Sequence, residues 1–278
     1  MSEKNGNDPQ YLPGHTDKET ERLQRQARLL APSTRWLLER AGIKAGMKVL
    51  DVGSGAGDVA LLAAELVGPQ GCVVGVDTNP TILEIARQRA AGLHHVTFLK
   101  GDIREVILDT DFDAAVGRHI FLYITDRAAV LQSIAGHLRP GGILAFQEYD
   151  ISLTKSLVAD EMIPTGFRRL IDWSLELYRR AGSPIQMSVL LSQAFRAAGL
   201  PLPQLQVDAM AGLGEQWEGY ELHEGTLRSL LPLLVKSGIT TEEEADVDTF
   251  AQRLRAEVAS LQKVLIGPVT VGAWTQKA

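Results

Sequence analysis

Short apolar runs alternate with amphipathic helical patterns along the middle of the chain. Runs of strand length lie at 48–52, 72–76, 96–99, 112–116 and 143–147. Between them, apolar residues recur at helical spacing over 58–67, 80–91 and 126–138. Strands that alternate with crossover helices form parallel sheets covered by helices on both faces. The pattern therefore predicts a doubly wound α/β core.

The pattern after Asp150 is less regular. It predicts an amphipathic helical insert over 157–181, a sheet-covering helix over 188–199, and strands over 204–209 and 269–275. With the first five strands, these elements define the expected fold class. It is an α/β, doubly wound (Rossmann-like), mostly parallel seven-stranded sheet with helical cap insertions.

The start of the chain and the inserts divide it into expected regions. Residues 1–10 are polar and typical of a tail, and helical spacing from Asp17 to Arg40 predicts a helical stretch that Pro32 breaks. We expect an N-terminal helical lid at 1–45 and a ligand-binding core at 46–150. The rest of the sheet, with cap inserts at about 151–182 and 214–265, is expected at 151–278.

Composition narrows the class of protein. The chain has 278 residues and a net charge of −6 from 34 acidic and 28 basic residues, which counts against a nucleic-acid partner. The single Cys72 allows no intrachain disulfide and makes no zinc site alone, so we expect no metal. No apolar run approaches the roughly 18–20 residues of a membrane span, and residues 1–10 lack a signal peptide's apolar core. We expect a soluble cytoplasmic protein with no membrane partner.

The strongest local motif is a glycine-rich turn within 49–58 (VLDVGSGAGD), which follows a predicted strand and opens a predicted helix. Gly53 and Gly55, on either side of Ser54, lack a Cβ, so the backbone can turn sharply and a ligand can approach it. Asp77 lies at the end of the second strand, 24 residues after Gly53. A carboxylate there could accept hydrogen bonds from both hydroxyls of a ribose.

Such a turn followed by an acid is shared by dinucleotide-binding and S-adenosylmethionine-binding proteins. A dinucleotide turn has its third glycine where this chain has Asp58, a carboxylate at the expected place of a diphosphate. Asp51, inside the strand end, suits an ammonium group better than a phosphate. The two acids favour a nucleoside that carries no phosphate.

Further candidates follow the third and fourth strands. Asp102 could accept a hydrogen bond from an adenine amino group while Ile103 packs against the ring, and Gly101 precedes them. The Gly117 carbonyl could hold an ammonium group, whereas Asp113 is expected to be structural.

These motifs together resemble those of the class I S-adenosylmethionine-dependent methyltransferases. The resemblance covers about 46–150 through VLDVGSGAG, VVGVD, LKGDI, FDAAVGRHIFLY and LRPGGILAFQE, and beyond 150 it is one of layout. The flanking segments look like those of bacterial small-molecule methyltransferases, some of which act in natural-product pathways. The resemblance implies S-adenosyl-L-methionine as the cofactor. The residues expected to contact it are Asp51, Gly53, Ser54, Gly55, Asp77, Thr78, Gly101, Asp102, Ile103, Gly117, Arg118 and Tyr11.

Methyl transfer requires an aligned nucleophile and needs a base only when that nucleophile arrives protonated. His119, after the fourth strand, could take a proton near pH 7 or pack as an ordinary histidine. Glu148, at the end of the fifth strand, could act as a base, stabilise a carbocation, or only order the strand end. Arg118 could hold an acidic substrate or pair with Glu148. Tyr11 could cover a sulfonium, which would add about 0.5–2 kcal/mol.

The predicted function is transfer of a methyl group to an oxygen, nitrogen or carbon atom of a small, largely apolar organic molecule. The alternative is a non-methylating protein on the same fold, either regulatory or catalysing a rearrangement or cyclisation. The exit 117–120 (GRHI) is not the Asn/Asp-Pro-Pro-aromatic turn of nucleic-acid methyltransferases, and exposed inserts could support a homo-oligomer. Aromatic residues of the inserts could line a substrate pocket or pack the inserts onto the core: Trp173, Tyr178, Trp217, Tyr220 and His223.

Overall fold

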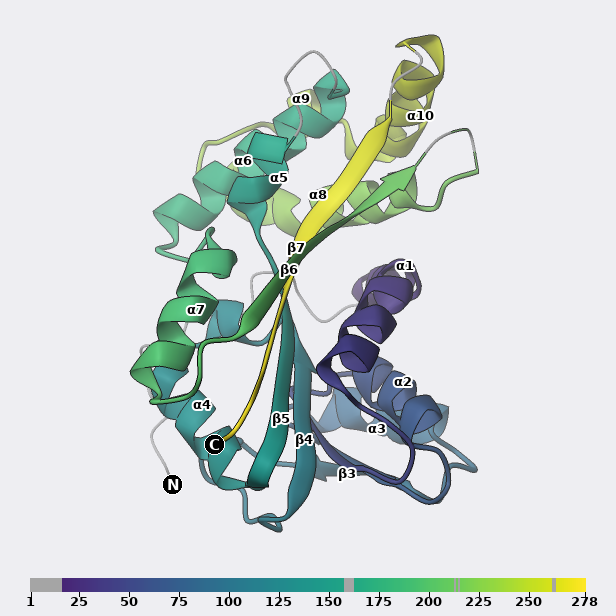
Figure 1. Cartoon of the computed structure of the whole chain (residues 1–278). Helices are drawn as coiled ribbons and strands as arrows, with labels where there is room; N and C mark the ends of the chain where they lie inside the picture. The colour runs from purple at the N-terminus through teal and green to yellow at the C-terminus, as the bar shows by residue number, and fades with distance from the viewer. Residues whose placement is uncertain (1–16, 158–162, 213, 215, 262–263) are drawn as a thin grey trace. The chain divides into compact units, whose positions relative to one another are not determined.

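A seven-stranded sheet organises the protein, of which the computed structural model describes residues 17–157, 163–212, 214, 216–261 and 264–278. The strand order is β3-β2-β1-β4-β5-β7-β6. This sheet, with its flanking helices, confirms the predicted fold class (Figure 1). The strands are β1 (Lys48–Val52), β2 (Cys72–Asp77), β3 (Val96–Lys100), β4 (Phe112–Arg118), β5 (Leu138–Tyr149), β6 (Gln204–Gly212) and β7 (Leu265–Gln276).

The strands β1 to β5 run parallel, and β7 is antiparallel to β5. Parallel pairing joins β3 to β2, β2 to β1, β1 to β4 and β4 to β5. Near the start of β5, the Gly141 N–H group donates to the Lys277 carbonyl at 3.0 Å. Just after the end of β5, the Asp150 N–H group donates to the Val269 carbonyl at 2.9 Å. The later residue of β5 therefore meets the earlier residue of β7, which is the antiparallel arrangement.

Helices connect and cover these strands, and several begin at a capping side chain. Asn79 accepts from the Thr81 N–H group at 2.9 Å, and Asp126 accepts from the Ala129 N–H group at 2.9 Å. The helices are α1 (Asp17–Ala41), α2 (Asp58–Val67), α3 (Pro80–Arg89), α4 (Arg127–Gly136), α5 (Ile151–Leu157), α6 (Thr165–Arg180), α7 (Met187–Ala197), α8 (Gly219–Lys236), α9 (Glu242–Ala245) and α10 (Phe250–Leu261). Short 3₁₀ turns lie at η1 (Phe121–Tyr123) and η3 (Val247–Thr249).

Two local predictions are wrong. Pro32 was expected to break the first helix, but α1 continues through it from Asp17 to Ala41. The fifth strand was expected over 143–147, but β5 already begins at Leu138 and includes 139–142 (RPGG). The extra residues are absorbed by an irregular register against β4, and Gly141 takes a positive φ of 72° there.

The chain divides into two compact units. The sheet unit comprises Ala31–Glu148, Ser188–Val207 and Val271–Ala278; the described residues of the helical unit come from Met1–Leu30, Tyr149–Met187 and Asp208–Thr270. In the sheet unit, α2 and α3 cover one side of the strands, and α4 and α7 the other (Figure 1). The buried cluster around α2 and α3 is mostly aliphatic, and the core of the helical unit holds aromatic residues from α6, α8 and α10.

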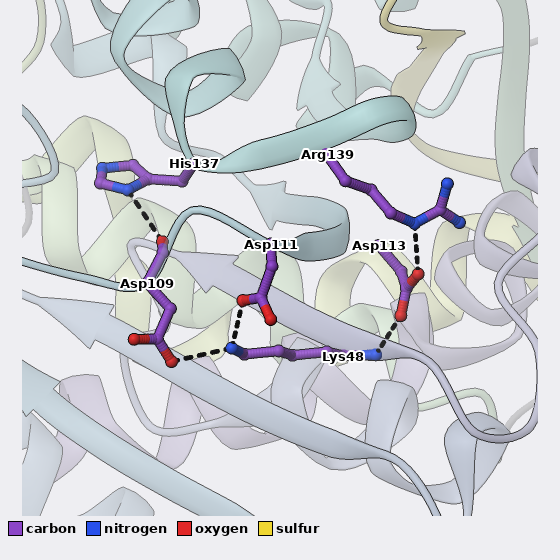
Figure 2. Close-up of polar contacts among 6 residues, drawn as sticks. All are labelled: Lys48, Asp109, Asp111, Asp113, His137 and Arg139. Carbon is purple, nitrogen blue, oxygen red and sulfur yellow. Dashed lines mark hydrogen bonds and ion pairs between the residues drawn. The ribbon is translucent and has the colours of Figure 1, made fainter.

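Ion pairs and hydrogen bonds link the starts of neighbouring strands at the amino-terminal edge of the sheet unit (Figure 2). Lys48, the first residue of β1, reaches Asp109 with its Nζ at 2.8 Å, and its backbone N–H group donates to Asp113 Oδ2 at 2.7 Å. The other oxygen of Asp113 accepts from Arg139 Nε at 2.6 Å. Asp113 thus joins the starts of β1, β4 and β5, which confirms that it is structural.

Candidate active site

The glycine turn follows β1 at the carboxyl end of the sheet, where open α/β sheets bind ligands. Gly53 and Gly55 have positive φ angles of 64° and 52°, a conformation that favours glycine. A Cβ on Gly53 would lie 2.4 Å from Ile120 Cγ2, whereas one on Gly55 would meet nothing within 4 Å. Packing against Ile120 therefore requires a glycine at position 53. The open space lies at Gly55, so a ligand can approach the turn there.

Asp77 fastens the glycine turn to the end of β2. Its Oδ2 accepts from the Gly55 N–H group at 2.9 Å, and its Oδ1 accepts from the Asn79 N–H group at 2.8 Å. A carboxylate oxygen has more than one acceptor site, so both oxygens can still bind the hydroxyls of a ribose. Thr78, the next residue, is exposed beside them.

Asp51 is a buried carboxyl group without hydrogen bonds. It is 1% exposed, and among the described residues neither of its carboxyl oxygens has a hydrogen-bond partner. Burial raises the pKa of Asp51 well above its ordinary range. The charge of Arg118 and the nearby Ala60 N–H group, which does not reach hydrogen-bond geometry, oppose this rise. A buried group left unpaired costs about 1–3 kcal/mol, so Asp51 suits a donor or a cation supplied by a ligand.

Ser54 is a second buried polar residue whose side chain lacks a partner among the described residues. It is 7% exposed, and its N–H group donates to the Val76 carbonyl at 3.0 Å, which ties the turn to β2. Its Oγ is buried and has no partner within the part of the chain that the structure describes. The turn therefore holds two neighbouring residues, Asp51 and Ser54, with unused hydrogen-bonding capacity.

Arg118, at the end of β4, is held by two side chains of the sheet unit. Its Nη1 donates to Thr34 Oγ1 at 2.9 Å, and its Nη2 lies 3.7 Å from Asp58 Oδ2. Asp58 also accepts from Arg89 Nη1 at 2.6 Å. Asp58, the residue where a dinucleotide turn has its third glycine, is thus paired with two guanidinium groups, which reduce its negative charge. The preference for a nucleoside without phosphates rests on Asp51 instead.

The residues after β3 and at the end of β4 have local partners. Both oxygens of Asp102 accept from Arg104, one of them from the backbone N–H group at 2.9 Å, and the hydrogen bond with Arg104 lowers the pKa of Asp102. Ile103 is buried, and the Gly101 N–H group donates to the Asp77 carbonyl at 3.0 Å. A Cβ on Gly117 would lie 2.8 Å from the Val52 carbonyl oxygen. The adenine contact of Asp102 and the ammonium contact of Gly117 stay predictions.

Glu148 is fully buried at the end of β5 and holds the turn that follows β4. Its Oε1 accepts from the Ile120 and Phe121 N–H groups at 2.8 and 2.9 Å. Its Oε2 has no hydrogen-bond partner among the described side chains and backbone groups. Burial raises the pKa of Glu148 to about 7, although the backbone donors oppose this. The carboxyl group is therefore about half ionised at neutral pH.

His119 occupies the same turn in a strained conformation. Its φ is 59°, in the left-handed region that costs a non-glycine residue about 1–2 kcal/mol. Its N–H group donates to the Gln147 carbonyl at 2.9 Å. Strand β5 therefore holds this turn both through its backbone and through the Glu148 side chain. Strain of this kind persists where the surroundings impose it, often at functional sites. The structure thus places the two catalytic candidates, His119 and Glu148, on one turn and the strand beside it.

Sequence reasoning missed the polar side chains that join α1 to this region. Gln147 is 2% exposed, and its Oε1 accepts from Thr34 Oγ1 at 2.6 Å while its Nε2 donates to Ser33 Oγ at 2.8 Å. The available signal was a glutamine within a predicted buried strand, where an unpaired amide would be costly. Tyr11, the expected lid residue, lies outside the described residues.

Two features that would change the class of site are absent from the described residues. No described helix is long and apolar enough to cross a membrane. The same residues contain no group of three or more His, Cys, Asp and Glu side chains placed to hold a metal ion.

Comparison with known proteins identifies the domain that carries this turn. Residues 43–179 match a family model described as a methyltransferase domain. The ubiquinone/menaquinone biosynthesis C-methyltransferase UbiE of Pseudomonas putida is 32% identical over 121 residues, which are 41% of this chain and 46% of the relative. The match thus spans about half the length of this curated relative.

Two solved structures share the fold at low sequence identity. Geranyl diphosphate C-methyltransferase of Streptomyces coelicolor, solved with Mg²⁺, geranyl diphosphate and S-adenosyl-L-homocysteine, is 15% identical with a TM-score of 0.52, over 96% of this chain and 86% of that chain. A phosphoethanolamine N-methyltransferase of Haemonchus contortus is 16% identical with a TM-score of 0.51, over 88% of this chain and 52% of that one. These likenesses show the fold.

Proposed function

The chain carries, over residues 43–179, a class I S-adenosylmethionine-dependent methyltransferase domain, and from this premise we propose what it methylates and with which residues. The proposed reaction transfers a methyl group from S-adenosylmethionine to a small, largely apolar organic molecule. The observation that carries the proposal is the buried Asp51 carboxyl group, which lacks hydrogen bonds and lies below a glycine turn with open space at Gly55.

The residues of the turn fit S-adenosylmethionine, which when bound supplies a methyl group already activated by a sulfonium. Asp51 would hold the ammonium group, because a cation repays the cost of ionising a buried carboxyl group. Asp77 would hold the ribose hydroxyls with its remaining acceptor sites while it fixes the Gly55 backbone. The low polarity around Asp51 also disfavours a diphosphate there, since two anions would then share a buried site.

Glu148 and His119 are the proposed catalytic residues for the acceptor. An acceptor atom that arrives protonated loses its proton when it takes a methyl group, and a group with a pKa near the working pH accepts that proton best. Burial sets the pKa of Glu148 at about 7, and its Oε2 is the carboxyl oxygen that the backbone donors leave unused. Glu148 also orders the strained turn at His119 through its Oε1, so base and turn are fixed together.

The acceptor class does not follow from the fold, because the same fold serves different acceptors. The two similar structures are named for a prenyl diphosphate and for a phosphorylated amine. The curated relative is named a C-methyltransferase, which supports a carbon acceptor among the three kinds of atom. A role in natural-product biosynthesis is part of this proposal.

Donor binding tests the proposal most directly. We expect S-adenosylmethionine and S-adenosylhomocysteine to bind the wild-type protein in calorimetry. Asp51→Asn should weaken that binding about 10-fold or more, since a hydrogen bond to a charged group contributes about 1.5–3 kcal/mol. Asp113→Asn is the matched control, because this acid lies at the opposite edge of the sheet unit and should leave donor affinity unchanged. If neither S-adenosylmethionine nor S-adenosylhomocysteine bound, the proposal would be refuted.

A further inference from the structure

The helical unit contains a cluster of four rings, which we call the aromatic cluster: Phe167, Trp217, Tyr220 and His223. The ring centroids of Phe167 and His223 lie 4.5 Å apart, and those of Trp217 and His223 lie 6.2 Å apart. Trp217 meets Tyr220 edge-on at 5.4 Å. The imidazole of His223 therefore lies against two aromatic rings.

His223 is a polar side chain whose hydrogen-bonding capacity is not fully used. The residue is 3% exposed, and its Nε2 is buried with no hydrogen-bond partner among the described residues. Burial lowers its pKa to about 3, so the imidazole is neutral at physiological pH. A phenylalanine would fill similar space without the penalty of an unpaired buried nitrogen. A ligand that bonds Nε2 would remove that penalty.

The position of Trp217 is built into the backbone around it. A Cβ on Gly212, at the end of β6, would lie 1.9 Å from the indole, and a Cβ on Gly219, at the start of α8, would lie 2.3 Å from it. Both glycines are thus needed for the indole to lie against the main chain. Trp217 is partly exposed and lies outside regular secondary structure, whereas Phe167, Tyr220 and His223 are buried on helices. Trp217 is therefore the one ring of the aromatic cluster that no helix carries.

The described guanidinium that lies against the aromatic cluster is already paired. Arg255 lies over the Tyr220 ring at 5.0 Å from its centroid, and its guanidinium is ion-paired with Glu221. The Tyr220 hydroxyl donates to the Gly214 carbonyl at 3.1 Å. A charged ligand would lose its hydration here and gain no counter-ion, so the cluster favours a neutral one.

We propose that the aromatic cluster is a binding site for an uncharged apolar molecule that bears a hydroxyl group, and that His223 Nε2 forms the hydrogen bond with that hydroxyl. A hydroxyl both donates and accepts, so it pairs with Nε2 in either tautomer of the imidazole. This site goes beyond the proposed function and does not rest on it, because binding of its ligand can be measured without any methyl donor.

Two probes that differ only in a hydroxyl group test the site: 2-naphthol and naphthalene. Calorimetry with the probe in the cell and full-length protein in the syringe should show that 2-naphthol binds about 10-fold more tightly than naphthalene. His223→Phe should bind both probes equally, and His223→Gln, which keeps a hydrogen-bonding group, should restore part of the preference. His95→Phe is the control, because His95 lies in the sheet unit and is partly exposed.

Further variants and outcomes separate this site from a packed core. Gly212→Ala should reduce the affinity for both probes by a similar factor, because the added Cβ displaces the Trp217 indole and leaves the His223 imidazole unchanged. Thermal unfolding of each variant verifies that it is folded. Equal affinity of the wild-type protein for the two probes, or no binding of either, would overturn the proposal. Donor binding measured on the same samples shows whether the proposed function fails independently.

Discussion

The sheet unit and the helical unit each bury a titratable side chain, and burial shifts their pKa values in opposite directions. Glu148 in the sheet unit has a pKa raised to about 7, and His223 in the helical unit has one lowered to about 3. Both side chains are kept near neutral because charge is costly in a low-dielectric interior. Their hydrogen bonds differ: Glu148 accepts two from backbone N–H groups, whereas His223 Nε2 has none among the described residues.

This difference separates two ways of building a site. In the sheet unit, polar groups stand at strand ends and are held by the backbone, so their places follow from the topology. In the helical unit, a polar group is placed by side-chain packing between helices. The first kind is fixed by the backbone, whereas the second changes with the side chains that pack around the polar group.

The largest expected change in stability is that of Glu148→Gln, and it depends on pH. The carboxyl group has a pKa of about 7 in the folded protein against 4.5 for an ordinary glutamate, so its contribution to stability is present below pH 4.5 and is lost as the pH rises through 7. By pH 8 the loss is about 3 kcal/mol, and an amide, which does not ionise, avoids it. The variant should therefore lose less stability than the wild type between pH 4.5 and 8 in urea unfolding.

The same variant should lose methyl transfer by about 100-fold or more, because an amide accepts no proton at neutral pH. A stabilised and inactive protein would agree with a base that is costly to ionise. Glu65→Gln, a variant of an exposed residue on α2, is the control and should change neither property. If Glu148→Gln keeps full activity, the catalytic assignment fails.

Gly53→Ala and Gly55→Ala compare two glycines of one turn. Both residues have positive φ, so each alanine costs about 1 kcal/mol of backbone strain. Only the alanine at position 53 also clashes with Ile120, which should bring its cost to about 3 kcal/mol in thermal or urea unfolding. Gly55→Ala should instead reduce donor affinity more than stability. Equal losses of stability would show that the space around the two residues does not differ.

His223 makes the helical unit sensitive to acid. Its pKa is about 3 when folded against 6.5 when unfolded, so the unfolded chain binds the proton first, and stability is lost as the pH falls below 6.5. Between pH 7 and pH 5 this amounts to about 2 kcal/mol. The loss should disappear in His223→Phe, which is measured by urea unfolding at both pH values. An unchanged pH dependence in this variant would mean that the imidazole is not buried as a neutral ring.

The two units also differ in how much the sequence revealed. The bounds of α2 were predicted as found, because glycines flank an uninterrupted amphipathic run. The strand ends that carry Asp51, Asp77 and Glu148 followed from the alternation of strands and helices. The start of β5 was missed, since Pro140 and two glycines resemble a turn although a strand can absorb them as an irregularity.

The aromatic cluster shows what a single sequence cannot supply. Trp217 and His223 were candidates for a pocket, but so were Trp173 and Tyr178, and helical spacing alone does not rank them. The distinction comes from long-range packing: Phe167 lies on α6, His223 on α8, and the backbone at Gly212 admits the indole. The hydrogen bonds of Gln147 to α1 were missed for the same reason, because their partners are more than 100 residues apart.

The smallest effects are expected at surface ion pairs, where the two units should behave alike. Asp111 pairs with Lys48 in the sheet unit, and Asp248 pairs with Arg228 in the helical unit, with side chains 71% and 83% exposed. Water and salt screen such pairs, so Asp111→Asn and Asp248→Asn should each change the free energy of unfolding by less than about 0.5 kcal/mol. Raising the salt concentration should shrink even this change. If either variant lost more than about 1 kcal/mol of unfolding free energy, surface charge would contribute to the difference between the units. Equal small losses would mean that the difference comes from the buried groups.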